Sequence, residues 1–150
     1  QKEVNYMKIS TRGRYGLRAM VDVAANTREG ECISLSCIAK RQNISESYLE
    51  QLFSALKKAG LLTSIRGKQG GYKLCREPEQ ITVGDILNAI EGPMTLVDCE
   101  AKTDACSNGD CHKCATKDVW EKLSNSIIDT ANGITLEQLA DNYIELNETE

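Results

Sequence analysis

The stretch SLSCIAKRQNISESYLEQLFSALKKAG, residues 34–60, has the pattern of two helices joined by a tight turn. Ser34 and Ser45 each precede a helical segment, where a hydroxyl can accept hydrogen bonds from the first backbone N–H groups of the helix. The second helix carries an apolar stripe at three- and four-residue spacing: Leu49, Leu52, Phe53 and Leu56. Gly60 follows its last turn, where helices commonly end. This pattern predicts a helix-turn-helix.

A β-hairpin is expected directly after this unit. Residues 61–66 and 72–74 are rich in β-forming side chains, and the segment between them, residues 67–71, is rich in glycine. A hairpin that follows a helix-turn-helix is a wing. Together with a first helix at about residues 11–26, these elements predict a winged helix-turn-helix DNA-binding domain over residues 7–80.

Further helices are expected in the second half of the chain. Thr82 and Thr135 each stand at the start of a helical segment that they can cap. Between them, a long helix starts near Thr116 and carries the apolar residues Val119, Trp120, Leu123, Ile127 and Ile128. The expected fold class is mainly α. The second unit, residues 81–145, holds these helices and a cysteine-rich loop, residues 97–115.

The net charge of −4 conceals an asymmetry along the chain. Residues 7–76 hold 13 Lys and Arg against 5 Asp and Glu, whereas residues 77–150 hold 4 against 16. A basic half is the electrostatic signature of a polyanion partner, and an acidic half is repelled by DNA and is expected to point away from it. Double-stranded operator DNA is therefore the partner expected for the basic half.

The candidates for base contact lie in the first turns of the second helix, the part of a helix-turn-helix that enters the major groove. They are Ser45, Ser47, Tyr48, Glu50 and Gln51. The structural alternative is that Ser45 only caps the helix and the others are only solvated. Glu50 is informative because a carboxylate near phosphates is unfavourable unless it accepts a hydrogen bond from cytosine N4.

The wing supplies two further candidates. Arg66 is expected to enter a narrowed minor groove, where the negative potential is enhanced. Lys68 is expected to contact phosphate or to remain a solvated charge. Lys57 and Lys58, at the end of the second helix, are expected to strengthen binding to any DNA sequence.

Four of the seven cysteines fall within sixteen residues, with the spacing C-x6-C-x4-C-x2-C. They are Cys99, Cys106, Cys111 and Cys114. The Gly, Asn, Asp and Ser residues around them cannot bury much apolar surface, so thiolates that converge on a metal ion or an iron–sulfur cluster are the expected stabiliser. A reversible disulfide switch is the alternative. On chemistry alone, a zinc site of four thiolates fits equally well.

The remaining residues argue against an enzyme and against a membrane protein. Cys32, Cys37 and Cys75 are expected to be small buried hydrophobic residues, and His112, the only histidine, an exposed bystander. A single histidine and the lack of a glycine-rich phosphate loop disfavour an enzyme. No apolar stretch has membrane-spanning length and the start lacks the core of a signal peptide, so a cytoplasmic chain with no membrane partner is expected.

Three motifs resemble the IscR-like iron–sulfur cluster regulators of the Rrf2 family of bacterial repressors. They are MKISTRGRYG at residues 7–16, ISESYLEQLF at 44–53 and SIRGKQGGY at 64–72, and the resemblance extends over residues 7–140. It implies a homodimeric transcription regulator in which a long C-terminal dimerisation helix, at about residues 116–130, pairs the subunits. It favours a [2Fe–2S] cluster over a [4Fe–4S] cluster or zinc. The alternative is a cluster-free thiol-redox or zinc-stabilised regulator of the same fold.

The cysteine spacing departs from that of these regulators, which have three cysteines spaced C-x5-C-x5-C and a histidine three residues beyond the last. Alignment on Trp120 makes Cys114 the third ligand and places Lys117, which cannot ligate, at the histidine position. Alignment on the total span makes Cys111 the third ligand and puts Cys114 in place of the histidine. We prefer the second alignment because it supplies four ligands, although Trp120 then lies three residues too far along.

Overall fold

The structure, a computed structural model, describes residues 9–27, 30–97 and 113–149. Those residues are mainly helical and contain one antiparallel sheet of two strands, which confirms the fold class expected from the sequence. In chain order the elements are α1 (Thr11–Asn26), α2 (Leu35–Gln42), α3 (Glu46–Lys58), β1 (Leu62–Ile65), β2 (Gly71–Leu74), the 3-10 helix η1 (Pro78–Gln80), α4 (Val83–Glu91), α6 (Lys117–Asn132) and α7 (Leu136–Glu148).

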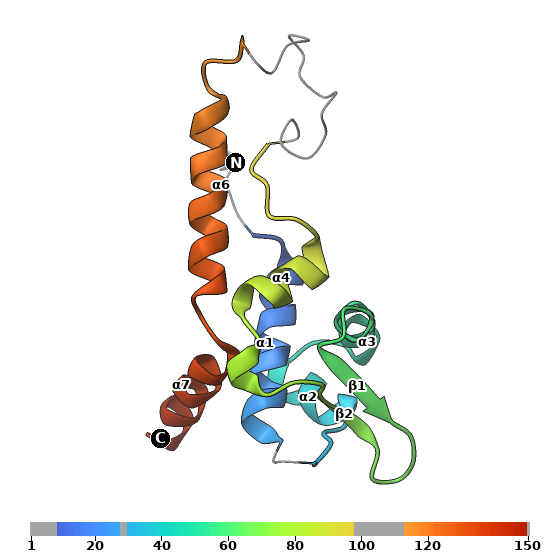
Figure 1. Ribbon diagram of the computed structural model, residues 1–150. Coiled ribbons are helices and arrows are strands. Elements are labelled where there is room, and N and C mark those ends of the chain that lie inside the picture. Colours follow the sequence, from blue (N-terminus) through green and yellow to red (C-terminus); the bar gives the residue numbers. More distant parts are fainter. Residues whose placement is uncertain (1–8, 28–29, 98–112, 150) are drawn as a thin grey trace, which may run out of the picture.

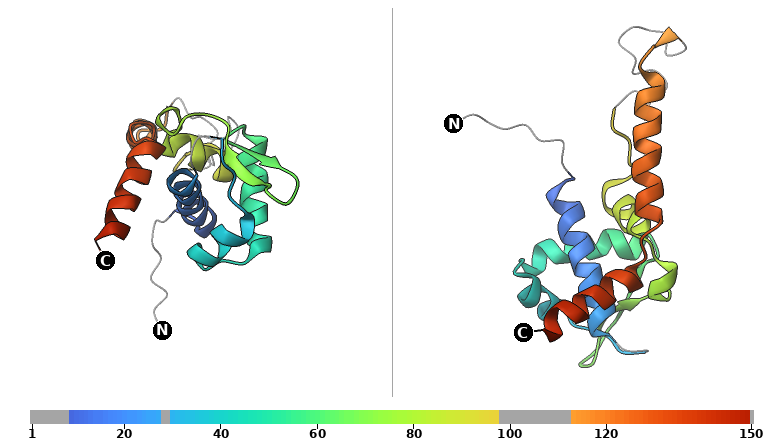
Figure 2. Two further views of the ribbon diagram at one scale, coloured as in Figure 1. Left: turned by 90° about the horizontal axis from the view of Figure 1, so that it is seen from below. Right: turned by 90° about the vertical axis from the view of Figure 1, so that its left-hand side faces the viewer.

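Helix α1 lies at the centre of the head, which we define as residues 9–91 (Figure 1). Helix α3 and the β1–β2 hairpin lie on one side of α1, and α7 lies on the opposite side (Figures 1 and 2). Helix α6 extends away from the head, and α7 then returns the chain to pack against α1 (Figure 1). None of the helices described is long and apolar enough to cross a membrane.

The helix starts predicted from the sequence are confirmed. At five of them a side-chain oxygen accepts a hydrogen bond from a backbone N–H in the first turn, and the caps are Ser10, Ser34, Ser45, Thr82 and Thr135. Helix α6 also starts where expected, after Thr116, but the Thr116 side chain makes no capping hydrogen bond. Between α2 and α3, Asn43 adopts the left-handed conformation, with a φ of 53°. Asparagine tolerates this conformation better than most residues, so it provides the tight turn of the helix-turn-helix.

The wing forms the expected hairpin, with Leu62 opposite Leu74 in an antiparallel pair. Tyr72 of β2 also exchanges two backbone hydrogen bonds with Ile33, of 2.8 and 2.9 Å, so the segment before α2 forms a bridge beside β2. The Tyr72 ring packs edge-on against Phe53 of α3, with 4.8 Å between ring centroids. The base of the wing is thereby fixed to the helix-turn-helix.

A single large core sets the position of α3. The apolar stripe predicted on this helix is fully buried, with Leu49, Leu52, Phe53 and Leu56 all 0% exposed. Met20 of α1 and Ile86 of α4 are buried to the same degree and belong to the same cluster. Because each such side chain contributes about 1.5–3 kcal/mol when removed from water, packing alone fixes the inner face of α3.

Helix α4 lies between α1 and α6, and glycines allow it to approach both. A Cβ atom added to Gly16 of α1 would lie 1.9 Å from Cδ1 of Ile90 in α4. A Cβ atom added to Gly84 of α4 would lie 1.9 Å from Oδ1 of Asn132 in α6. Glycine at these two positions therefore lets the side chains of Ile90 and Asn132 lie directly against the backbone of the neighbouring helix.

The expectation that the cysteines outside the loop are buried is wrong for two of them. Cys37 and Cys75 are exposed, and Cys32 is half-buried. Cys37 lies on the outward face of α2, because Ile38 and Ala39 occupy the positions that face the core. Cys75 follows the end of β2; its backbone N–H bonds the carbonyl of the buried Leu61, at 3.1 Å, while the residue itself is exposed.

Candidate nucleic-acid interface and cysteine segment

The start of α3 presents most of the predicted base-contacting side chains to solvent. Ser45, Ser47, Glu50 and Gln51 are exposed. Ser45 also caps the helix, because its Oγ accepts a hydrogen bond of 3.2 Å from the backbone N–H of Tyr48. Hydroxyl, carboxylate and amide groups at the start of one helix are the donors and acceptors that can pair with base edges in the major groove.

Tyr48 differs from the other candidates because its side chain is half-buried. Its ring meets the ring of Tyr15 in α1 edge-to-face, with 6.1 Å between centroids and an interplanar angle of 90°. Such a pair contributes about 0.5–1.5 kcal/mol beyond its buried area. Tyr48 therefore helps to hold the start of α3 against α1.

The turn of the wing carries Arg66 and Lys68, both exposed. The hairpin lies on the same side of the molecule as α3 (Figures 1 and 2). Lys57, at the end of α3, donates a hydrogen bond of 2.6 Å from Nζ to Oγ of Ser64 in β1. Lys57 thus joins α3 to the wing, and Lys57 and Lys58 are both exposed.

The charge asymmetry of the sequence is also an asymmetry of the surface. Helices α6 and α7 expose the acidic side chains Asp118, Glu121, Asp129, Glu137, Asp141, Glu145 and Glu148. Helix α7 lies on the side of α1 opposite α3 and the wing (Figures 1 and 2). A DNA duplex that approached α3 would therefore meet basic side chains and leave the acidic face of α7 in solvent.

The cysteine segment is only partly within the described residues. Cys99, Cys106, Cys111 and His112 lie outside them, and Cys114 is exposed just before α6. A hydrogen bond with the hydroxyl of Thr116, 3.4 Å from Sγ, lowers the pKa of the Cys114 thiol. The thiolate is the form of cysteine that binds metals.

The donor set suits a soft metal centre. Four thiolates are the ligands found on [2Fe–2S] and [4Fe–4S] clusters and in structural zinc sites, so the cysteines of residues 99–114 fit any of the three. Among the residues that the structure describes, no group of three or more His, Cys, Asp or Glu side chains is placed to hold a metal ion.

The chain before the cysteine segment is attached to two helices. Before it, Glu91 at the end of α4 accepts hydrogen bonds from the Ser10 hydroxyl and from the backbone N–H of Gly13, the latter at 3.0 Å. After Glu91, the backbone N–H of Leu96 donates to Oγ of Ser124 in α6, at 3.4 Å. The chain that leads into the segment therefore contacts α1 first and α6 next.

Glu91 and Asp22 were not among the functional residues predicted from the sequence, although both form hydrogen bonds to another helix. Asp22 is fully buried in α1, one turn beyond Ala19 and next to Val23, which are buried too. A carboxylate on the apolar face of an amphipathic helix is the signal that marks such a residue, because a buried charge needs partners.

Known proteins resemble the chain over nearly its whole length. Residues 9–142 match the sequence profile of the Rrf2 family, described as iron-dependent transcriptional regulators. The HTH-type transcriptional regulator IscR of Pectobacterium atrosepticum is 42% identical over 141 residues, which cover 94% of this chain and 84% of the relative. The solved structure of T. potens IscR has a TM-score of 0.73 at 43% identity and covers 91% of this chain and 88% of its own. The structure of CymR, the global cysteine regulator of B. subtilis, has a TM-score of 0.75 at 40% identity and covers 91% and 98%.

Proposed function

Because the chain belongs to the Rrf2 family of iron-dependent transcriptional regulators, we propose that it binds operator DNA as a homodimer and senses iron–sulfur or redox status through a cysteine-ligated [2Fe–2S] cluster. Like its relatives, the chain is a transcriptional regulator of the IscR type, and it is not an enzyme. Its operators lie in the bacterial cytoplasm, which is where we place the protein.

The observation that carries the role of α3 is its exposed polar start beside the exposed wing, on the side of the molecule away from α7. Glu50 and Gln51 are one turn beyond the cap, where a recognition helix meets bases. Arg66 and Lys68 extend the same surface through the wing. We assign α3 to the major groove and the wing to the minor groove and the flanking phosphates.

An exposed apolar stripe on α6 supports the dimer. Val119, Leu123 and Ile127 are 48%, 45% and 40% exposed, and their four-residue spacing places them on one face of the helix. A second copy of α6 would cover this face by two-fold symmetry. Such a dimer presents two recognition helices to half-sites about one turn of DNA apart, so a pseudo-palindromic operator is expected.

We assign Cys99, Cys106, Cys111 and Cys114 as the cluster ligands. The exposed Cys114, with its lowered thiol pKa, and the resemblance to proteins named IscR support this choice. When bound, the cluster supplies iron–sulfur chemistry that responds to iron supply and oxidants. The cysteines would hold it at the junction between the chain that leaves α4 and the start of α6.

The contacts of α4 supply a route from that junction to the DNA-binding face. Helix α4 meets α1 through Glu91 and Ile90, and α1 meets the start of α3 through Tyr15. A ligand set drawn from both ends of the cysteine segment would restrain α4 relative to α6. The state of the cysteines therefore biases the position of the head, as a switch of this kind requires.

Metal analysis of protein purified without oxygen tests the assignment. Brown protein with equal amounts of iron and acid-labile sulfide supports the cluster, and the iron content per chain separates [2Fe–2S] from [4Fe–4S]. Colourless protein with one zinc per chain contradicts it and supports the zinc-stabilised alternative.

The exposed thiols of Cys37 and Cys75 favour a second candidate, a cluster-free thiol-redox regulator. Cys37 lies in the first turn of α2, within the helix-turn-helix, where an added group would disturb DNA binding. Metal-free protein treated with a mild oxidant should then lose operator affinity, and Cys37→Ser should prevent the loss. Unchanged affinity after oxidation of both thiols contradicts this candidate.

A further inference from the structure

One stripe of α1 contacts the helices on both sides of the turn in the helix-turn-helix, through Gln42 before the turn and Tyr48 after it. We propose that Arg18 and Gln42, anchored on the buried Asp22, are positioning residues for operator discrimination, because they set the orientation of α3 on DNA. The proposal rests on base reading by α3, and the experiment below separates the failure of one from the failure of the other.

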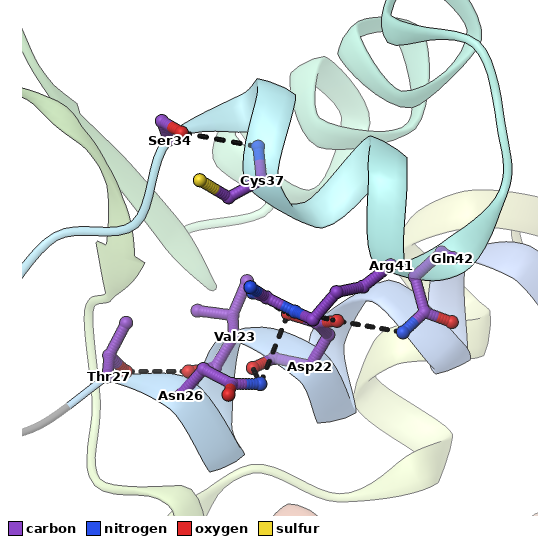
Figure 3. Close-up of polar contacts among 8 residues, drawn as sticks. All are labelled: Asp22, Val23, Asn26, Thr27, Ser34, Cys37, Arg41 and Gln42. Atoms are coloured by element: carbon purple, nitrogen blue, oxygen red, sulfur yellow. Dashed lines mark hydrogen bonds and ion pairs between the residues drawn. The ribbon is translucent and has the colours of Figure 1, made fainter.

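Asp22 is the fixed point of this network. Its carboxylate is 0% exposed and accepts from Arg41 Nη2 at 2.6 Å, from Arg41 Nε at 3.0 Å and from Gln42 Nε2 at 2.8 Å (Figure 3). The amide of Asn26 donates to the same carboxylate at 3.3 Å. Moving the carboxylate away from these donors would leave a buried charge unpaired, which is strongly unfavourable. The end of α2 is thereby held to α1.

Gln42 is fixed at both ends of its amide. While its Nε2 donates to Asp22, its Oε1 accepts from Nε of Arg18 at 3.2 Å. The guanidinium of Arg18 also donates to the backbone carbonyl of Gln42 at 3.3 Å. Gln42 is the last residue of α2, so a cation lies at the carbonyl end of this helix, where the helix dipole favours it.

The same face of α1 reaches the start of α3. The Arg18 guanidinium lies over the ring of Tyr15, 5.2 Å from its centroid, and that ring meets Tyr48 edge-to-face. Tyr15, Arg18 and Asp22 are three and four residues apart, so they form one stripe along the helix. This stripe contacts the helix before the turn through Gln42 and the helix after it through Tyr48. Only two residues, Asn43 and Ile44, separate Gln42 from the α3 cap.

A role in orienting α3 explains this network better than a role in stabilising the fold does. The apolar core already holds the inner face of α3, since Leu49, Leu52 and Phe53 are fully buried. Apolar burial is not directional, so it specifies the orientation of a helix less sharply than hydrogen bonds of fixed geometry do. Directional bonds to Gln42, at the turn, restrict the motions that would carry Glu50 and Gln51 out of register with base edges.

Two charge-conserving variants test the role, with the full chain purified as for metal analysis. Arg18→Lys keeps the charge but loses the planar fork that bonds Gln42 at two points. Gln42→Met keeps the volume and loses both amide bonds. Each is expected to lower the ratio of operator affinity to random-DNA affinity by about tenfold. This is the size of the discrimination that one base contact contributes. Affinity for random DNA and its salt dependence should change little, because no phosphate contact is removed.

Three controls separate the possible outcomes. Arg76→Lys conserves charge at an exposed site outside the network, and Leu136→Ala lowers stability from a buried site in α7. If Leu136→Ala reduces discrimination as much as Gln42→Met does, in protein that is still folded, the network acts through stability and the proposal is overturned. If Glu50→Ala changes discrimination but Arg18→Lys and Gln42→Met do not, the proposal fails and base reading by α3 stands. If Glu50→Ala has no effect either, base reading by α3 itself is wrong.

Discussion

The Glu91 carboxylate at the end of α4 accepts a hydrogen bond of 3.0 Å from the backbone N–H of Gly13, in the first turn of α1. The hydroxyl of Ser10, which caps the same helix, donates to the same oxygen. A Cβ atom added to Gly13 would lie 2.2 Å from that oxygen, so the contact requires glycine. The start of α1 is therefore held by the residue that ends α4, six residues before the start of the cysteine-rich loop at residue 97.

Loss of the Glu91 side chain should destabilise the head. Glu91→Gln keeps an acceptor and loses the charge at the start of α1, which is expected to cost about 0.3–1 kcal/mol of unfolding free energy. Glu91→Ala loses both and is expected to cost about 1–2 kcal/mol. Urea unfolding measures the difference, with Asn88→Ala on the exposed side of α4 as the matched control. Equal unfolding midpoints for Glu91→Ala and the wild type would contradict this account of the contact.

The cysteine assignment predicts which replacements remove the cluster. Cys99→Ala and Cys106→Ala should abolish the visible absorbance of anaerobically purified protein, and Cys75→Ala should leave it unchanged. Cys111→Ala and Cys114→Ala decide the register, since loss in both supports a set of four cysteines. Loss with Cys114→Ala alone would restore the alignment on Trp120. A full cluster in Cys99→Ala would show that the ligands are wrongly assigned.

The apolar stripe on α6 predicts that one charge at its centre prevents dimer formation. Leu123→Glu would place a carboxylate in the proposed interface between two copies of α6, where burial without a partner is strongly unfavourable. Sedimentation at micromolar concentration should show a dimer for the wild type and a monomer for Leu123→Glu. Leu146→Glu in α7, at a side chain that is 73% exposed and outside the stripe, is the control and should remain dimeric. A wild-type monomer of 16.5 kDa would exclude the interface.

The DNA-binding residues divide into those that read sequence and those that strengthen all binding. Glu50→Ala and Arg66→Ala should change which operator is preferred, by about 1–3 kcal/mol of discrimination. Lys58→Ala and Lys68→Ala should weaken binding to every sequence and flatten the dependence of log affinity on log salt by about one unit. Lys57→Ala should in addition loosen the wing, because Lys57 bonds Ser64. Equal weakening of operator and random DNA by Glu50→Ala would exclude base reading.

The local elements were predictable because their signals are local. The hydroxyls at Ser34, Ser45 and Thr82 identify helix starts within a few residues, and the apolar stripe of residues 49–56 identifies the buried face of α3. The order of a tight turn, an amphipathic helix and a hairpin then allows few arrangements other than a winged helix-turn-helix.

The contacts that the sequence did not reveal join residues far apart in the chain. Glu91 meets Gly13 across 78 positions, and Asp22 meets Gln42 across 20. No spacing rule connects such pairs, because their proximity depends on how α4 and α2 pack on α1. The exposure of Cys37 has a different origin, which is local: Ile38 and Ala39 face the core and leave Cys37 on the outer face of α2, against the burial that is usual for cysteine.

The central claim is that the state of the cysteine segment changes DNA binding, and one titration tests it most directly. Operator sequences selected from a random library would be titrated at one salt concentration with cluster-loaded protein and with the same preparation after iron removal. The account predicts that the two forms differ in affinity for at least one operator and that Cys99→Ala behaves as the metal-free form. Indistinguishable binding of the two forms at every selected site would contradict it.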